Sequence, residues 1–287
     1  MYSKMVKAKF GPGGNSDAFR LAGFSSTLDA PAWLSHIGLD AYEYEAGNGL
    51  SAGPSVLREI GRRAAECGIK MSYHTPYFIS LSGMVEEKRL KSIDYIRQSI
   101  DAAHLLGAST IVVHCGSCAK ISRDEAMRLA SDTLVRAAST LDTYGIKIGL
   151  ETMGKINQLG TLDEVLTLCT LSENFVPVVD FGHLNARTLG SIKTEADYEY
   201  IFDEISRRLG KEYADTLHCH FSKIEYTGMG EKKHLTFEDE LYGPSPEALA
   251  QVIARKGLSP TIICESAGTQ SYDAKILKNE YEKAKNN

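Results

Sequence analysis

Residues 110–151 read TIVVHCGSCAKISRDEAMRLASDTLVRAASTLDTYGIKIGLE and contain the pattern that decides the fold. Two short apolar runs, 110–114 and 147–151, flank an amphipathic stretch at 124–144. Short apolar runs are typical of buried parallel strands, whereas apolar residues spaced by three and four are typical of a helix. Gly145 follows the amphipathic stretch, as expected where a helix ends. The segment therefore predicts a strand, a helix and a second strand.

The same alternation extends along the chain. Strand-like runs lie at 6–10, 39–44, 69–74, 110–114, 147–151, 176–180, 216–220 and 261–265. Helical spacing is found at 28–36, 56–67, 85–106, 124–144, 162–171, 197–209, 246–256 and 272–285. Eight strands alternating with eight helices predict a closed (β/α)8 TIM barrel. Because no Pro-, Gly- or Ser-rich linker interrupts the pattern, we expect residues 1–287 to form a single barrel domain.

Composition and charge disfavour several classes of protein. The 287 residues are 43% hydrophobic, enough to bury a large core. No apolar run approaches the roughly 18 to 20 residues of a membrane span, and no apolar stretch follows the N-terminal lysines as in a secretory signal. A net charge of −5 argues against a general polyanion binder but leaves local positive patches open. We therefore expect a cytoplasmic protein without a membrane partner.

The cysteines support that expectation. Six of them lie singly, mostly inside apolar segments, as is typical of reduced thiols. Cys115 and Cys118 have a C-x-x-C spacing, but the second cysteine pair of a zinc ribbon is missing. A structural zinc or redox role for this pair is therefore a minor alternative.

Imidazoles and carboxylates end six of the predicted strands. They are His74, His114, Glu151, Asp180, His220 and Glu265, while His183 and His234 follow two of the same strands. A single such residue is usually a cap or a satisfied polar group. Six together indicate a shared site, since the C-terminal ends of barrel strands face one mouth. Mixed nitrogen and oxygen donors favour zinc or manganese, so the sequence predicts a polynuclear metal centre.

The motifs around these residues resemble a known family. They are His74-Thr-Pro-Tyr77, His114-Cys-Gly-Ser117, Glu151-Thr-Met-Gly-Lys155, Asp180-Phe-Gly-His183, His220-Phe-Ser-Lys223, Lys232-Lys-His234 and Glu265-Ser266. Their order and approximate spacing are similar to those of the endonuclease IV family of apurinic/apyrimidinic endonucleases, in the xylose isomerase-like superfamily. The resemblance implies a barrel with zinc that hydrolyses double-stranded DNA 5′ to an abasic site. No obligate protein partner is evident, and we expect a monomer.

The resemblance also implies roles for the individual residues. His74 and His114 resemble ligands of a first zinc ion, and Glu151 resembles a bridge to a second. Asp180, His220 and Glu265 resemble the other ligands of that second ion, and His183 and His234 resemble ligands of a third. Glu151 and Glu265 are also the expected catalytic residues. Hydrolysis through a metal-bridged hydroxide suits this set, since a metal ion lowers the pKa of bound water from roughly 15.7 to about 7.

One position departs from the family pattern. The residue two before His234 is Lys232, where the family has an aspartate ligand. A protonated lysine cannot bind a cation, so two or three ions per chain are expected, with the third weak or absent. Lys232 is instead expected to contact a substrate phosphate; the alternative is a solvated loop lysine.

Contacts to DNA are expected from loops above the metal centre. Tyr77 and Phe78 could wedge into the duplex at the missing base, or could pack against the following helix. Asn48, Lys155, Arg187 and Lys223 also follow predicted strands and could reach phosphates. His218 shares a strand face with His220; the motif favours His220 as the ligand and leaves His218 deeper in the barrel.

Two other functions are compatible with parts of the pattern. Sugar isomerases and epimerases of the xylose isomerase-like superfamily look similar in Glu151, Asp180, His220 and Glu265, which could hold one divalent ion beside a ketose. They give no role to His74, His114, His183 and His234. A metal-binding scaffold without catalysis is the third possibility, which the Glu151 bridge disfavours.

Overall fold

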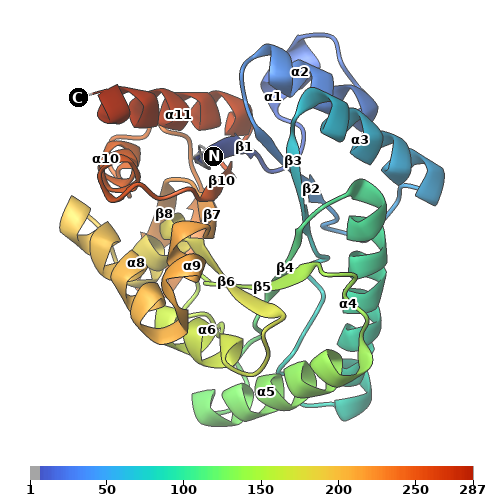
Figure 1. The fold of residues 1–287 in the computed structure, drawn as a ribbon. Helices are drawn as coiled ribbons and strands as arrows, with labels where there is room; N and C mark the ends of the chain where they lie inside the picture. The colour runs from blue at the N-terminus through green and yellow to red at the C-terminus, as the bar shows by residue number, and fades with distance from the viewer. Residues whose placement is uncertain (1–6, 287) are drawn as a thin grey trace.

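The chain folds into a (β/α)8 barrel, in a computed structural model that describes residues 7–286 (Figure 1). The parallel barrel strands are β1 (Lys9–Pro12), β2 (Ala41–Glu45), β3 (Lys70–His74), β4 (Thr110–His114), β5 (Lys147–Glu151), β6 (Phe175–Asp180), β7 (His218–Phe221) and β10 (Thr261–Cys264). Their order is β1-β10-β7-β6-β5-β4-β3-β2. A bridge between Gly13, which follows β1, and Glu43 of β2 connects the first and last strands of this order. The predicted fold class is confirmed.

The chain also forms helices, most of which surround the strands on the outside of the barrel (Figure 1). They are α1 (Asp17–Leu21), a 3-10 turn η1 (Thr27–Asp29), α2 (Ala30–His36), α3 (Pro54–Cys67), α4 (Glu86–Leu106), α5 (Arg123–Thr140), α6 (Leu162–Cys169), α7 (Phe181–Arg187), α8 (Glu195–Leu209), α9 (Lys211–Asp215), α10 (Pro246–Lys256) and α11 (Gln270–Asn286). Their buried side chains, such as Leu57, Ile96 and Leu134, pack in the apolar core. No helix in the described part is long and apolar enough to cross a membrane.

The strand-helix-strand segment at 110–151 folds largely as predicted. All of β4 except its last residue is buried, and β4 pairs with β5 so that His114 lies opposite Glu151. The side chain of Ser122 caps α5 by accepting a hydrogen bond from the Glu125 backbone N–H. The helix ends at Thr140 and not at Tyr144, because Leu141 is extended and Tyr144 has a φ of 51°.

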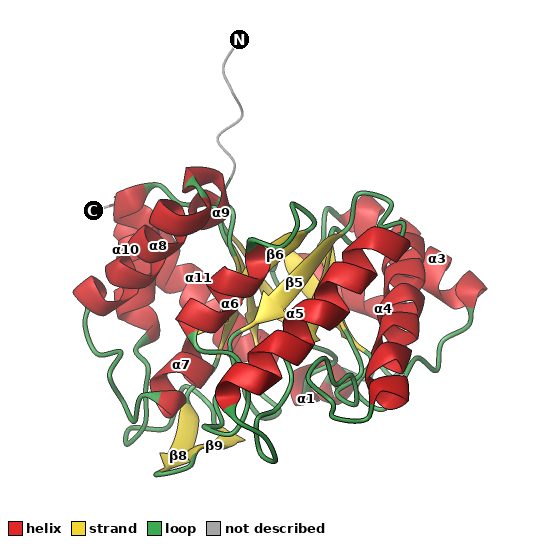
Figure 2. Cartoon of the chain, turned by 90° about the horizontal axis from the view of Figure 1, so that it is seen from below, coloured by secondary structure: helices red, strands yellow, loops and turns green. Residues whose placement is uncertain are grey.

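Several elements differ from the prediction. The first strand occupies Lys9–Pro12 and not 6–10; Val6, where that prediction begins, lies outside the described residues. The helices α1, α7 and α9 and the hairpin of β8 (Ile224–Thr227) and β9 (Gly230–His234) were not predicted. Helix α7 and the hairpin lie together at one end of the barrel (Figure 2). Both contribute residues to the site described next.

Candidate metal centre

The register of the parallel strands brings the predicted residues together. His114 lies opposite Glu151 on neighbouring strands, and Asp180 lies opposite His220. The mouth above them is a pocket of about 470 Å³. Its walls include His74, His114, Glu151, His183, His234 and Glu265. All eight predicted metal ligands therefore lie in one region.

Glu151 is at the centre of this region. Its Oε2 lies 3.1 Å from Nε2 of His114 and 3.5 Å from Nε2 of His74, and its Oε1 lies 2.9 Å from Nδ1 of His220. Burial raises the pKa of this carboxyl, but the imidazoles outweigh that effect and hold the pKa well below its usual range. Glu151 is therefore a buried anion, shared between two groups of side chains.

The second group contains Asp180, His220 and Glu265 together with Glu151. Oδ1 of Asp180 accepts a 2.7 Å hydrogen bond from the His183 backbone N–H, which caps α7. Oε1 of Glu265 lies 3.3 Å from Nδ1 of His220. Oδ2 of Asp180 and Oε2 of Glu151 are buried, and neither accepts a hydrogen bond of regular geometry within residues 7–286, although imidazole nitrogens lie 3.1 to 3.5 Å away. Buried carboxylate oxygens that share imidazole neighbours without hydrogen-bonding them fit a bound cation.

A third group is formed by His183, Glu231 and His234. Nδ1 of His183 lies 3.0 Å from the Thr152 carbonyl, and Nδ1 of His234 lies 2.9 Å from Oγ of Ser222. These contacts fix both rings so that Nε2 faces Glu231, at 3.5 Å from His183 and 4.0 Å from His234. A ligand imidazole is commonly oriented in this way, through its other nitrogen.

Glu231 corrects the expectation that this group lacks a carboxylate. Glu225 pairs with Lys233 and Tyr226 pairs with Glu231, so Lys232 is the extra residue of a β-bulge. The bulge turns Lys232 and Lys233 to the same side, where both contact Glu225. Glu231 therefore faces His183 together with His234. Lys232 bonds to Glu225 and does not replace a ligand.

Two glycines make room for Glu231. A Cβ on Gly154 would lie 2.6 Å from Cβ of Glu231 and 3.1 Å from Cδ2 of His183. Gly230 has a φ of +83°, and a Cβ there would lie 2.2 Å from the Gly154 carbonyl oxygen. The Glu231 N–H donates to that same carbonyl at 3.1 Å. The loop after β5 thus holds the hairpin against the metal centre.

The aromatic residues predicted to contact DNA lie at the rim of the mouth. Tyr77 is 61% exposed, lines the pocket and donates a hydrogen bond to Oδ1 of Asn48, which is itself exposed. Phe78 is 43% exposed and packs edge-to-face on Tyr95 of α4, with ring centroids 4.7 Å apart. Tyr77 is therefore the more available of the two for a ligand.

The basic residues near the mouth are differently placed. Lys155 lines the pocket. Lys223 donates to the backbone carbonyls of Phe237 and Asp239, which holds the loop after β9. The expectation that Arg187 could reach a phosphate is wrong, because its guanidinium is buried and donates to the carbonyls of Met153, Lys155 and Gln158.

Three acidic residues near the centre were missed in the sequence: Glu43, Glu45 and Glu231. Glu43 and Glu45 lie two apart on β2, and Oε2 of Glu45 lies 4.0 Å from Nδ1 of His74. Their spacing on one strand face was the available signal. His218, the first residue of β7, lies further along the strand from the mouth than His220, as expected. Its Nε2 lies 2.9 Å from Oε2 of Glu43.

Comparison with known proteins places the chain in a family. A family model described as xylose isomerase-like TIM barrel matches residues 31–285, so the chain belongs to that family. The "Uncharacterized protein MJ0133" of Methanocaldococcus jannaschii is 30% identical over 254 residues, covering 86% of this chain and 89% of that protein. The "Probable endonuclease 4" of Acholeplasma laidlawii is 27% identical over 186 residues. That match covers 62% of each chain, less than two thirds of the relative's length.

Solved structures with the same fold include an epimerase-like protein and an endonuclease. A D-tagatose 3-epimerase-like protein matches with a TM-score of 0.72 and 20% identity, covering 97% of this chain and 98% of that one. Endonuclease IV from Thermus thermophilus matches with a TM-score of 0.68 and 17% identity, covering 96% and 100%. At this level of identity both matches show the fold alone.

Proposed function

We propose that this member of the xylose isomerase-like TIM barrel family is a metal-dependent phosphodiesterase that cuts double-stranded DNA 5′ to an abasic site. The observation that carries the proposal is the set of three adjoining groups of imidazoles and carboxylates with the spacing of metal ligands, two of which share Glu151. Similarity to a protein described as a probable endonuclease 4 supports the choice of substrate.

Each group of side chains has a complete donor set for one ion. His74 and His114, whose Nε2 atoms both face Oε2 of Glu151, form the first group with it. Glu151, Asp180, His220 and Glu265 form the second, and His183, Glu231 and His234 form the third. Imidazole and carboxylate donors suit zinc, with manganese as the alternative. Bound ions supply an activated water and stabilise the charge on phosphate oxygens. Glu151 and Glu265 are the proposed catalytic residues.

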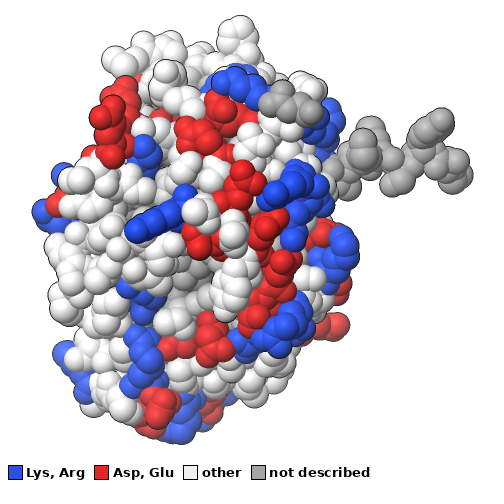
Figure 3. All heavy atoms as spheres, turned by 90° about the vertical axis from the view of Figure 1, so that its left-hand side faces the viewer, with Lys and Arg blue, Asp and Glu red and all other residues white. Residues whose placement is uncertain are grey.

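Side chains of this chain orient the ligand imidazoles, and others are proposed to contact the DNA. Rings anchored through Nδ1, as in His183 and His234, hold Nε2 toward the centre. Tyr77 at the rim, supported by Phe78, which packs on Tyr95, is proposed to fill the gap at the missing base. Asn48, Lys223 and Lys232 are proposed to contact the DNA backbone. The flank in Figure 3 mixes acidic and basic side chains, so it offers no broad positive surface. Binding is therefore expected at the mouth.

A one-ion sugar epimerase is the second candidate, favoured by the fold match to a D-tagatose 3-epimerase-like protein. The group of Glu151, Asp180, His220 and Glu265 offers the ligands for the one divalent ion that this candidate requires. It leaves His74, His114, His183, Glu231 and His234 without a role. The endonuclease accounts for all of them.

One assay separates the two candidates. The purified protein, loaded with zinc or manganese, is incubated with duplex DNA carrying a synthetic abasic site and, separately, with a panel of ketoses. We expect nicking of the DNA, and we expect Glu151→Gln to lower its rate by several orders of magnitude because it removes the shared anion and keeps the size. Glu66→Gln, an exposed change on α3, is the matched control. Intact DNA together with turnover of a ketose rejects the endonuclease.

A further inference from the structure

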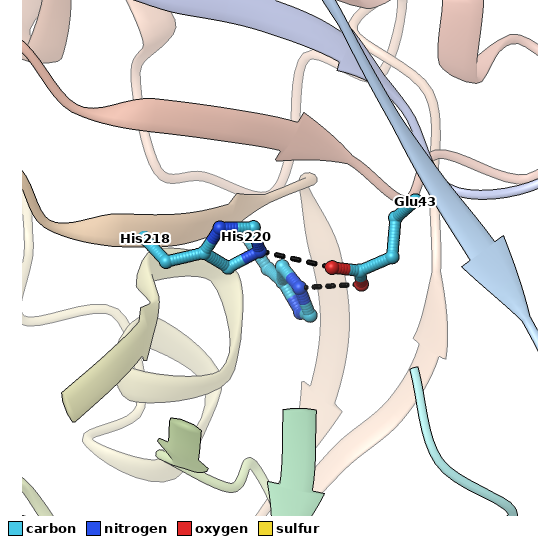
Figure 4. Close-up of side chains that lie close together, drawn as sticks. All are labelled: Glu43, His218 and His220. Carbon is cyan, nitrogen blue, oxygen red and sulfur yellow. Dashed lines mark hydrogen bonds and ion pairs between the residues drawn. The ribbon is translucent and has the colours of Figure 1, made fainter. Parts of the chain in front are cut away.

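Glu43 lies inside the barrel between two histidines of β7 (Figure 4). Its Oε1 lies 2.8 Å from Nε2 of His220, and its Oε2 lies 2.9 Å from Nε2 of His218. Glu43 and His220 are fully buried, and His218 is 6% exposed. A buried carboxylate is costly unless donors surround it, and here two imidazoles do so.

His220 is turned the opposite way from the other histidines of the metal centre. His74, His114, His183 and His234 face a carboxylate of their group through Nε2. His220 faces Glu151 and Glu265 through Nδ1, at 2.9 and 3.3 Å. Its Nε2 is therefore left pointing at Glu43.

This orientation determines where the proton of His220 must lie. A neutral imidazole carries one proton and one lone pair, so a ring that ligates through Nδ1 must carry its proton on Nε2. Nε2 of His220 and Oε1 of Glu43 are both buried, and neither makes a hydrogen bond of regular geometry within residues 7–286. The two atoms lie within ion-pair distance, at 2.8 Å, so a proton on Nε2 faces the Glu43 carboxylate.

A separate ion bound by Glu43, His218 and His220 is incompatible with this orientation of His220. Such an ion would need the Nε2 lone pair of His220, while the centre needs the Nδ1 lone pair. A neutral imidazole does not offer both. His218 has a simpler role, because its Nε2–H holds Oε2 of Glu43 and so fixes the direction of Oε1.

We propose that Glu43, oriented by His218, is a positioning residue that keeps the proton of His220 on Nε2 and its Nδ1 directed at the second ion. The inference rests on the proposed metal centre and deepens it. Removal of an outer partner of this kind typically weakens metal affinity about 10- to 100-fold. The loss should affect one ion, because the other two groups have their own anchoring contacts.

The test compares Glu43→Gln, which keeps an acceptor oxygen and loses the charge, with Glu43→Leu, which loses both. Ser72→Ala is the matched control, since Ser72 is buried on β3 directly opposite Glu43. Zinc is titrated into metal-free protein against a chromophoric chelator, which gives the number of ions and the affinity of each. Long-range ¹H–¹⁵N NMR of the zinc-loaded wild type identifies the protonated nitrogen of each bound imidazole.

We expect one ion to bind about 10-fold more weakly in Glu43→Gln and about 100-fold more weakly in Glu43→Leu, with Ser72→Ala unchanged. The wild type should show one zinc-bound ring protonated at Nε2. Unchanged affinities in Glu43→Gln, equal weakening of every ion, or a His220 protonated on Nδ1 overturns the inference. If Glu43→Leu does not fold, Glu43→Gln decides alone. A wild type that binds neither zinc nor manganese overturns the proposed function itself.

Discussion

Oε2 of Glu231 lies 3.5 Å from Nε2 of His183, although Glu231 belongs to a hairpin outside the barrel sheet and His183 to the helix that follows β6. The β8–β9 hairpin thus brings a carboxylate over the mouth that no barrel strand supplies there. The Glu231 carboxylate reaches this position because Lys232 is the extra residue of the β-bulge in β9. The neighbouring lysines, Lys232 and Lys233, contact Glu225 instead.

The first prediction follows from this contact. Glu231→Gln should lower the zinc content by one ion per chain, because it removes the anionic donor of the third group. Lys232→Ala should leave the zinc content unchanged, since its ammonium contacts Glu225. Metal analysis after dialysis against a weak chelator measures both. Loss of zinc in Lys232→Ala with full zinc in Glu231→Gln would falsify this assignment.

A second prediction concerns the loop that supports the hairpin. Gly154→Ala should also weaken the third ion, because the new Cβ would lie 2.6 Å from Cβ of Glu231 and force the two segments apart. Gly53→Ala is the control, since a Cβ there meets nothing within 4 Å. Zinc titration of both variants checks the prediction. Equal zinc affinities of Gly154→Ala and Gly53→Ala would show that the hairpin can shift without weakening zinc binding.

Protons should leave the protein when zinc binds. In the metal-free protein burial lowers the pKa of His74, but Glu45 and Glu151 outweigh it and raise the pKa to about 10. Burial also lowers the pKa of His183, yet Asp180 and Glu151 raise it to about 9. Both rings are therefore protonated at pH 7 and must lose that proton to bind a metal.

Zinc affinity should accordingly rise with pH between about 6 and 8, by about ten-fold per pH unit for each proton released. Glu265 adds to the effect, because burial raises the pKa of its carboxyl to about 8. Calorimetry in two buffers of different ionisation enthalpy counts the protons. Identical heats in the two buffers would show that the ligands are already deprotonated.

The two rim aromatics should respond differently to truncation. Tyr77→Ala should weaken binding to abasic DNA by roughly 1 to 3 kcal/mol, as expected for loss of one stacked base, with little change in thermal stability. Phe78→Ala should lower stability instead, since it loses the packing on Tyr95, worth about 0.5 to 1.5 kcal/mol beyond buried area. Melting curves and DNA titrations of both variants are the measurements. Equal DNA affinity for Tyr77→Ala and wild type excludes the wedge.

The barrel and much of its site were predictable because both depend on local patterns. Apolar runs that end in His114, Glu151 or Asp180 mark strand ends, and parallel strands place their ends at one mouth. The motif also chose His220 over His218, and His220 is the one that lies beside Glu151.

What was missed depends on contacts that the local sequence does not encode. Tyr42-Glu43-Tyr44-Glu45 alternates like a half-exposed strand, yet Glu43 is fully buried because two histidines from β7 meet it inside the barrel. Glu231 is not among the predicted ligands because the family motif puts the carboxylate two residues before the histidine, at position 232. Glu231 is three positions before His234, and in a regular strand two such side chains point to opposite faces. Only the bulge at Lys232 brings them together.

Glu45 provides the last prediction, because it distinguishes a charged substrate from a neutral one. Its side chain is 36% exposed and lines the pocket beside His74. Burial raises the pKa of its carboxyl to about 7, so above pH 7 the carboxyl is mainly ionised and its charge opposes any phosphate entering the mouth. Glu45→Gln should therefore tighten binding of abasic DNA at low salt, and the gain should shrink at high salt as the charge is screened. A neutral ketose should show no such salt dependence. DNA affinity of Glu45→Gln and the wild type, measured at low and at high salt, tests this prediction. Ser72→Ala, which changes no charge, is the control. Tighter binding by Glu45→Gln that does not depend on salt would indicate a change in the shape of the site and not in its charge.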